Sequence, residues 1–217
     1  MIKSKKIIIT AALVAGLGIS AVFYASSTTK ADQTASQNAF SNLVQEHQIT
    51  KSKDKKPFVK INNKTYENTD FLAYKESKNV IQRNNSQPVL SDEEIKGEFI
   101  KESVLEQEAD KQNFNVSSDE AKAFADKMKQ AVAEAKDPQT QQFLKDYTSS
   151  LGITEDEYWS QYATPAYQKA LKIGKLKQNF YMEEKAKNDS ISDADLNKAW
   201  EQQQEKLVSE ANVEILQ

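Results

Sequence analysis

Residues 90–135 read LSDEEIKGEFIKESVLEQEADKQNFNVSSDEAKAFADKMKQAVAEA, and their pattern predicts two consecutive helices. The first begins at Ser91, because Glu94 three residues later completes the reciprocal hydrogen bonds of a capping box. Its apolar residues form i,i+4 pairs that point roughly 140° apart around the helix axis. These pairs are Ile95/Phe99, Ile100/Val104 and Leu105/Ala109. A helix with apolar residues on several sides has several neighbours, so we expect it to be the central helix of the fold.

The second helix begins at Ser117, which Glu120 follows with the same capping spacing. Its apolar residues share one sector roughly 100° wide, so this helix is expected to pack on one side only. They are Ala121, Phe124, Ala125, Met128, Val132 and Ala135. Residues 112–116 form a very short link, which predicts that the two helices are an antiparallel αα-hairpin.

Caps and helix breakers predict five further helices, which begin at Thr69, Pro138, Thr154, Thr164 and Ser192. Gly152 has the position of a C-terminal cap after the second of these helices. Thr164 and Pro165 predict a new helix start, and that helix continues to about Lys187. The total is about seven helices, which indicates a mainly α fold.

A small β-hairpin is predicted near residue 58. Val59 and Ile61 alternate with polar residues, and Asn62-Asn63 supplies the positive φ of a tight turn. Val213 and Ile215 alternate in the same way near residue 217. Because an isolated two-stranded hairpin is only marginally stable, we expect this C-terminal strand to join it.

Residues 1–31 contain a lysine cluster followed by an apolar run from Ile7 to Ala25, which indicates an export signal. The run is nearly long enough to span a bilayer, so both cleavage after Ala31 and retention as a membrane anchor remain open. Residues 32–57 are polar and predict a flexible linker, and residues 58–217 form the domain. His47 lies in the linker and is interpreted as a solvated histidine. The expected location is extracytoplasmic, either anchored at the cell envelope or secreted.

The composition excludes several classes of protein. Cysteine is absent, so disulfides, thiolate metal sites and a lipidated cysteine are excluded. Without residues 1–31, which contain four lysines, 25 basic residues face 32 acidic ones, a net charge of −7. This acidic balance argues against nucleic acid as a partner. Lysine is abundant and Arg83 is the one arginine, a composition that favours a Gram-positive bacterium.

We predict no catalytic residue, no metal ligand and no cofactor. The acidic groups at residues 155–157 and at Asp193 and Asp195 lie in first helical turns, where capping and the helix dipole explain them. There is no GxSxG motif, no phosphate-binding glycine loop and no His or Cys cluster.

Aromatic residues are concentrated between residues 147 and 181, where seven of the chain's 19 aromatics occur. They either pack the helices together or line a hydrophobic surface that binds unfolded chains, a role for which partly exposed Tyr and Trp are suited. The candidates for client binding are Tyr158, Trp159, Tyr162, Tyr167 and Tyr181.

The order of these elements resembles the N-terminal chaperone domain of SurA-type and PrsA-type foldases, which is similar to the substrate-binding module of trigger factor. The resemblance covers roughly residues 58–217. It rests on FVKINNKTYENTDF at 58–71, the helix pair at 90–135, FLKDYTSSLGITEDEYWSQYATPAYQKALKIGKL at 143–176 and ISDADLNKAW at 191–200. It implies a helical domain with a small hairpin that a C-terminal strand joins.

The resemblance implies an ATP-independent chaperone that binds unfolded or secreted polypeptides outside the cytoplasmic membrane. A parvulin prolyl-isomerase domain, which usually follows ISDADLNKAW, is absent, and so is the lipidated cysteine of PrsA-type proteins. Prolyl isomerase activity is therefore an alternative by family only. The other alternative is a module that serves one dedicated partner of the cell envelope. The oligomeric state stays open.

Overall fold

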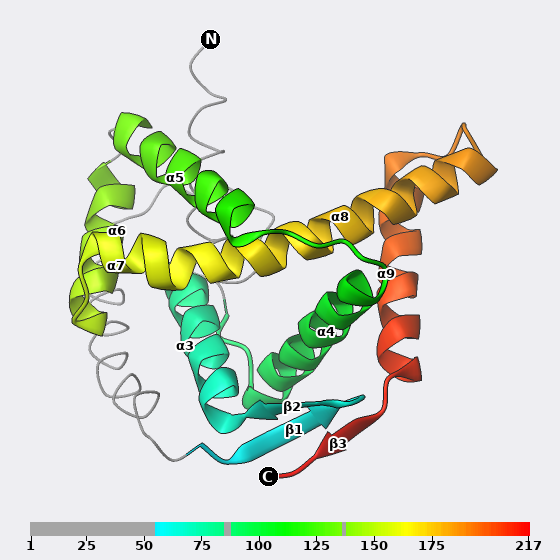
Figure 1. The fold of residues 1–217 in the computed structure, drawn as a ribbon, viewed down its shortest axis with the longest axis horizontal. Helices are drawn as coiled ribbons and strands as arrows, with labels where there is room; N and C mark the ends of the chain where they lie inside the picture. The colour runs from blue at the N-terminus through cyan, green and yellow to red at the C-terminus, as the bar shows by residue number, and fades with distance from the viewer. Residues whose placement is uncertain (1–54, 85–87, 136–137) are drawn as a thin grey trace.

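The computed structural model describes residues 55–84, 88–135 and 138–217, which form a mainly α-helical fold with one small antiparallel sheet (Figure 1). The mainly α prediction is confirmed. The predictions for the export signal, for most of the linker and for His47 lie outside the described residues.

The sheet has three strands, β1 (Pro57–Ile61), β2 (Lys64–Glu67) and β3 (Val213–Ile215), in the order β2-β1-β3. Asn62 has φ 54°, as the tight turn requires. β3 pairs antiparallel with β1, so that Val59 lies opposite Ile215 and Ile61 opposite Val213. The predicted hairpin and the predicted association of the C-terminal strand are therefore both confirmed.

Helix α4 (Asp92–Lys111) is the central helix, as expected. Its Ser91 capping box is formed: the backbone N–H of Ser91 donates to Glu94 at 2.7 Å, and the backbone N–H of Glu94 donates to the Ser91 hydroxyl at 3.3 Å. α4 contacts β1 and three helices, namely α3 (Asn68–Asn84), α8 (Thr164–Lys187) and α9 (Asp193–Glu210). Its apolar pairs point in several directions because each direction has a neighbour.

Helix α5 (Ser118–Ala135) does not pack against α4 as an αα-hairpin, so that prediction is wrong. Figure 1 shows α5 on one side of α8 and α4 on the other. The link runs beside α8, where Gln168 donates to the carbonyl of Val116 at 2.6 Å and Lys175 donates to the carbonyl of Asn115 at 3.0 Å. The single apolar stripe of α5 is covered by α8, which comes later in the chain.

A continuous helical segment runs from residue 155 to residue 187. α6 (Pro138–Leu151) ends at Gly152 with φ 64°, and the Thr154 capping box then starts α7 (Glu155–Glu157). The π-helix η1 (Tyr158–Ala163) leads from α7 directly into α8.

The predicted helix from Thr164 to Lys187 is α8, but the predicted cap at Thr164 is wrong, because helical turns precede it. Thr164 has helical angles (φ −59°, ψ −50°), and both its N–H and its hydroxyl donate to the carbonyl of Trp159. The wide π turn shifts the preceding carbonyls out of the i−4 register, and Pro165 then occupies the first turn of α8, where a missing N–H is tolerated. The described residues contain six helices, one fewer than expected, when α7, η1 and α8 are counted together.

Two apolar clusters meet at α4. In the first, the rings of Phe58, Tyr66, Phe71 and Tyr74 surround Phe99 of α4, with edge-to-face contacts between 5.4 and 6.3 Å. The second joins α4 to α8 and α9 and contains Leu105, Ala109, Ile173, Leu176 and Trp200. The sheet and the α8–α9 pair are thus held by different parts of one helix.

Candidate functional site

Three of the five aromatic candidates are buried in the packing between helices. Tyr158, Trp159 and Tyr167 are almost inaccessible to solvent. The Tyr158 ring contacts those of Tyr147 and Trp159, and the Tyr167 ring contacts that of Phe124 at 5.0 Å. These three side chains hold η1 and α8 against α5 and α6, so in this structure they are not available to a partner.

The other two candidates, Tyr162 and Tyr181, are half-buried and lie on different parts of the continuous helix. Tyr181 donates a 2.6 Å hydrogen bond to Asn197 on α9. In Figure 1 α9 runs across the direction of α8, and the C-terminal end of α8 projects beyond α9 at one end of the molecule. Met182, beside Tyr181, is 57% exposed in this part of α8. The five candidates therefore do not form one surface.

The buried tyrosines are neutral at physiological pH. Burial raises the pKa of Tyr158 and of Tyr167 above the ordinary value, and burial with the nearby Glu76 charge raises the pKa of Tyr147. Among the described residues the Tyr158 hydroxyl has no hydrogen-bond partner. Phenols in this state are poor nucleophiles and poor bases.

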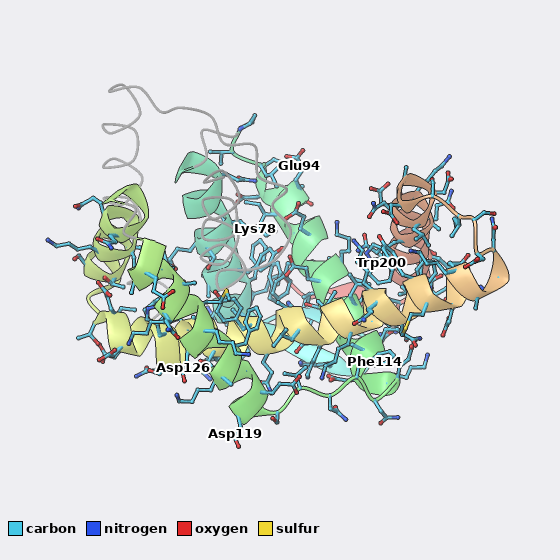
Figure 2. All side chains as sticks on the ribbon, turned by 90° about the horizontal axis from the view of Figure 1, so that it is seen from above. Lys78, Glu94, Phe114, Asp119, Asp126 and Trp200 are labelled. Atoms are coloured by element: carbon cyan, nitrogen blue, oxygen red, sulfur yellow. The ribbon has the colours of Figure 1, made fainter. Side chains whose placement is uncertain are left out.

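A charged cluster fixes α3 and α8 to α4. Glu102 of α4 is buried, and its carboxylate accepts a 2.8 Å hydrogen bond from Tyr74 of α3. Lys78 of α3 is labelled in Figure 2. Its ammonium group lies 2.7 Å from Glu98 and 3.4 Å from Glu102, and Lys169 of α8 lies 3.6 Å from Glu102. Burial and the Glu102 charge raise the pKa of Tyr74. The cluster sets the positions of three helices and is enclosed by them.

The acidic residues of the helix starts have local partners. Asp156 accepts a hydrogen bond from Lys129 of α5, which lowers the pKa of the carboxyl group. Glu157 accepts from the backbone and the hydroxyl of Thr154 within the capping box. Asp195 accepts from the hydroxyl of Ser192, and Asp193 lies 3.8 Å from Lys185. In the part of the chain that the structure describes, no three His, Cys, Asp or Glu residues gather as a metal site.

Large apolar side chains are exposed at positions that the sequence analysis did not select. They are Val89, Met182, Ile215 and Leu216. Ile215 and Leu216 are adjacent, 46% and 41% exposed, at the edge of the sheet. The alternation of apolar and polar residues predicted the strand. No local pattern in the sequence indicates that this strand lies at the edge of the sheet, where its apolar side chains are uncovered. None of the described helices has both the length and the hydropathy needed to cross a membrane.

These residues form a mainly α-helical domain. Its large exposed apolar side chains lie before α4, near the C-terminal end of α8, and in and directly after β3. Comparison with family models, with curated proteins and with solved structures found no match.

Proposed function

We propose that this chain is an ATP-independent chaperone of the holdase type that binds unfolded or secreted polypeptides outside the cytoplasmic membrane. The observation that carries the proposal is the separation of two small apolar surfaces. One contains Tyr181 and Met182 near the C-terminal end of α8, and the other contains Ile215 and Leu216 at the sheet edge. The central helix α4 contacts α8 and β1, and β3 pairs with β1.

Small, separated apolar surfaces favour weak contact at several points. Each one buries too little area to retain a folded partner, whereas an unfolded chain is long enough to reach both and exposes many apolar segments. Charged side chains lie near both surfaces, including Lys177 and Glu183 on α8 and Glu214 on β3. They would keep a loaded complex soluble.

Two sequence features support the same function. Residues 1–31 have the pattern of an export signal or anchor, which would place the domain where secreted chains emerge unfolded. The order of elements, from the N-terminal hairpin through the helices to a strand that returns to it, is the order that the SurA-type and PrsA-type resemblance implies. In this proposal the protein uses neither metal nor ATP and does not catalyse prolyl isomerisation.

The test is light scattering of two unrelated denatured proteins diluted into buffer that contains the full chain in lipid nanodiscs, with empty nanodiscs as the blank. We expect both proteins to aggregate more slowly, increasingly so with excess chain. A variant with Met182→Glu and Ile215→Glu should protect less than a control with Gln141→Glu and Gln202→Glu, which adds the same charge at two exposed polar positions.

Failure to protect either client would overturn general chaperoning. Protection of one secreted protein alone would indicate a module with a dedicated partner instead. Acceleration of proline isomerisation in a peptide assay would contradict the non-catalytic part of the proposal.

A further inference from the structure

Strand β3 has a free edge. β1 lies on one side of it, and the described residues provide no strand on the other side. The backbone N–H of Asn62 donates to Asn212 and the N–H of Leu216 donates to Phe58, so residues 212, 214 and 216 direct their backbone groups toward β1. In an antiparallel ladder the intervening residues face the opposite way. Val213 and Ile215 therefore present their N–H and C=O groups at the free edge.

The apolar inner face of the sheet is incomplete at this edge. Tyr66, Val59 and Ile215 form one row across the three strands, with exposures of 7%, 0% and 46%. A further strand beside β3 would place a side chain next to Ile215 and extend the row. The opposite edge is different, because the ammonium group of Lys64 lies 4.9 Å from the centre of the Tyr66 ring and protects β2.

Charge indicates which segment fits. On the outer face Glu214 lies opposite Lys60 of β1, and its other side is open. A basic side chain on an added strand would extend this alternation of charge. A second copy of β3, paired so that Val213 and Ile215 of both copies are used, would place Glu214 opposite Glu214, and like charges opposite each other are destabilising.

We propose that the free edge of β3 binds an extended segment of a client polypeptide as a fourth strand, with apolar residues on either side of a Lys or Arg that lies opposite Glu214. This inference rests on the proposed chaperone function and assigns one of its contacts. Main-chain hydrogen bonds to Val213 and Ile215 would provide binding that tolerates many sequences, and Glu214 would provide a modest preference.

The test uses two labelled seven-residue peptides, centred on Val-Lys-Val and on Val-Glu-Val, and measures their binding to the full chain in nanodiscs by fluorescence anisotropy. We expect the lysine peptide to bind roughly two- to fivefold more tightly, as a single cross-strand charge pair allows. A double variant, Lys60→Glu with Glu214→Lys, keeps the pair between β1 and β3 but reverses the charge at the edge. It should prefer the glutamate peptide.

Two controls locate the binding. Glu134→Lys changes the charge at an exposed position of α5, which does not contact the sheet, and it should leave the preference for the lysine peptide unchanged. Hydrogen exchange of the Val213 and Ile215 amides should slow when the lysine peptide is added, and the Glu214 amide, which faces β1, should change less.

The proposal is overturned if the double variant keeps the preference for the lysine peptide, or if no peptide binds. It is equally overturned if the two edge amides are already protected without peptide and sedimentation shows a dimer. Suppressed aggregation together with any of these results would retain the chaperone function and assign client binding to another surface. If the chain neither suppresses aggregation nor binds a peptide, the chaperone function is overturned as well.

Discussion

The hydroxyl of Tyr74 on α3 donates a 2.8 Å hydrogen bond to the carboxylate of Glu102 on α4, next to Lys78. Lys169 of α8 reaches the same carboxylate from another side, at 3.6 Å. One buried acidic group thus connects the consecutive helices α3 and α4 to α8, which lies far along the chain. The Tyr74 hydroxyl and the Lys78 and Lys169 ammonium groups offset the free-energy cost of burying the Glu102 charge.

Replacing Glu102 by Gln should destabilise the fold. The amide keeps the shape of the side chain but no longer compensates the Lys78 and Lys169 charges, and we expect a loss of about 1.5–3 kcal/mol in the free energy of unfolding. Urea denaturation followed by circular dichroism measures it. Glu93→Gln removes an exposed pair with Lys96 and should cost under about 1 kcal/mol. Equal effects of the two substitutions would contradict the structural role of Glu102.

Two Tyr→Phe substitutions should differ in their effect. Tyr74→Phe removes the hydrogen bond to Glu102 and should cost about 1–2 kcal/mol. Tyr158→Phe removes a buried hydroxyl that has no partner among the described residues, so it should be neutral or stabilising by up to about 1 kcal/mol. Thermal denaturation of both variants and of the wild type measures the change in stability that each substitution causes. A strong loss in Tyr158→Phe would show that its hydroxyl has a partner in solution.

Asn62 should be sensitive to substitution for two separable reasons. Its side chain accepts from the N–H of Asn212 and donates to Gln107 of α4, and its φ is 54°. Asn62→Gly loses the side-chain bonds but tolerates the backbone angle, and should cost about 1–2 kcal/mol. Asn62→Ala should cost about 1 kcal/mol more, because a Cβ disfavours positive φ. The measurement is equilibrium unfolding, and equal losses would show that the backbone angle carries no penalty.

The Asn62 variants should also loosen β3. Hydrogen exchange at Glu214, whose amide faces β1, is expected to accelerate in both variants. The α5 amides serve as the internal control, because α5 lies away from the sheet.

The Ser91 capping box should produce a measurable pH effect. Hydrogen bonds from the Ser91 hydroxyl and then from its backbone lower the pKa of Glu94 in the folded state. The resulting stabilisation is therefore present above the pKa of the unfolded chain and is lost as the pH falls through the lower folded pKa. In Ser91→Ala, an NMR titration should find the Glu94 pKa closer to its ordinary value. Ser117→Ala, at the start of α5, is the control and should leave the Glu94 pKa unchanged.

Local signals in the sequence predicted the turn and most helix starts correctly, although Thr69 lies inside α3 and does not cap it. The capping boxes at Ser91 and Thr154 connect residues three apart, and the Asn62 turn depends on the conformational tolerance of one residue. Such features are set by neighbours along the chain, so their energetics can be inferred without the fold. The association of the C-terminal strand with the hairpin was also predicted from the sequence, because an isolated two-stranded hairpin is only marginally stable.

The tertiary structure decided the remaining features. The apolar stripe of α5 packs against α8, and Gln168 and Lys175 of α8 bind the link between α4 and α5. Burial of Tyr158 and Tyr167 and exposure of Ile215 depend on which elements meet across the fold. The sequence by itself determined where the main elements begin and that they are mainly helical, since those choices depend on short-range hydrogen bonds. Only packing between distant segments decided which apolar residues remain at the surface, because each segment can bury its apolar face against more than one neighbour.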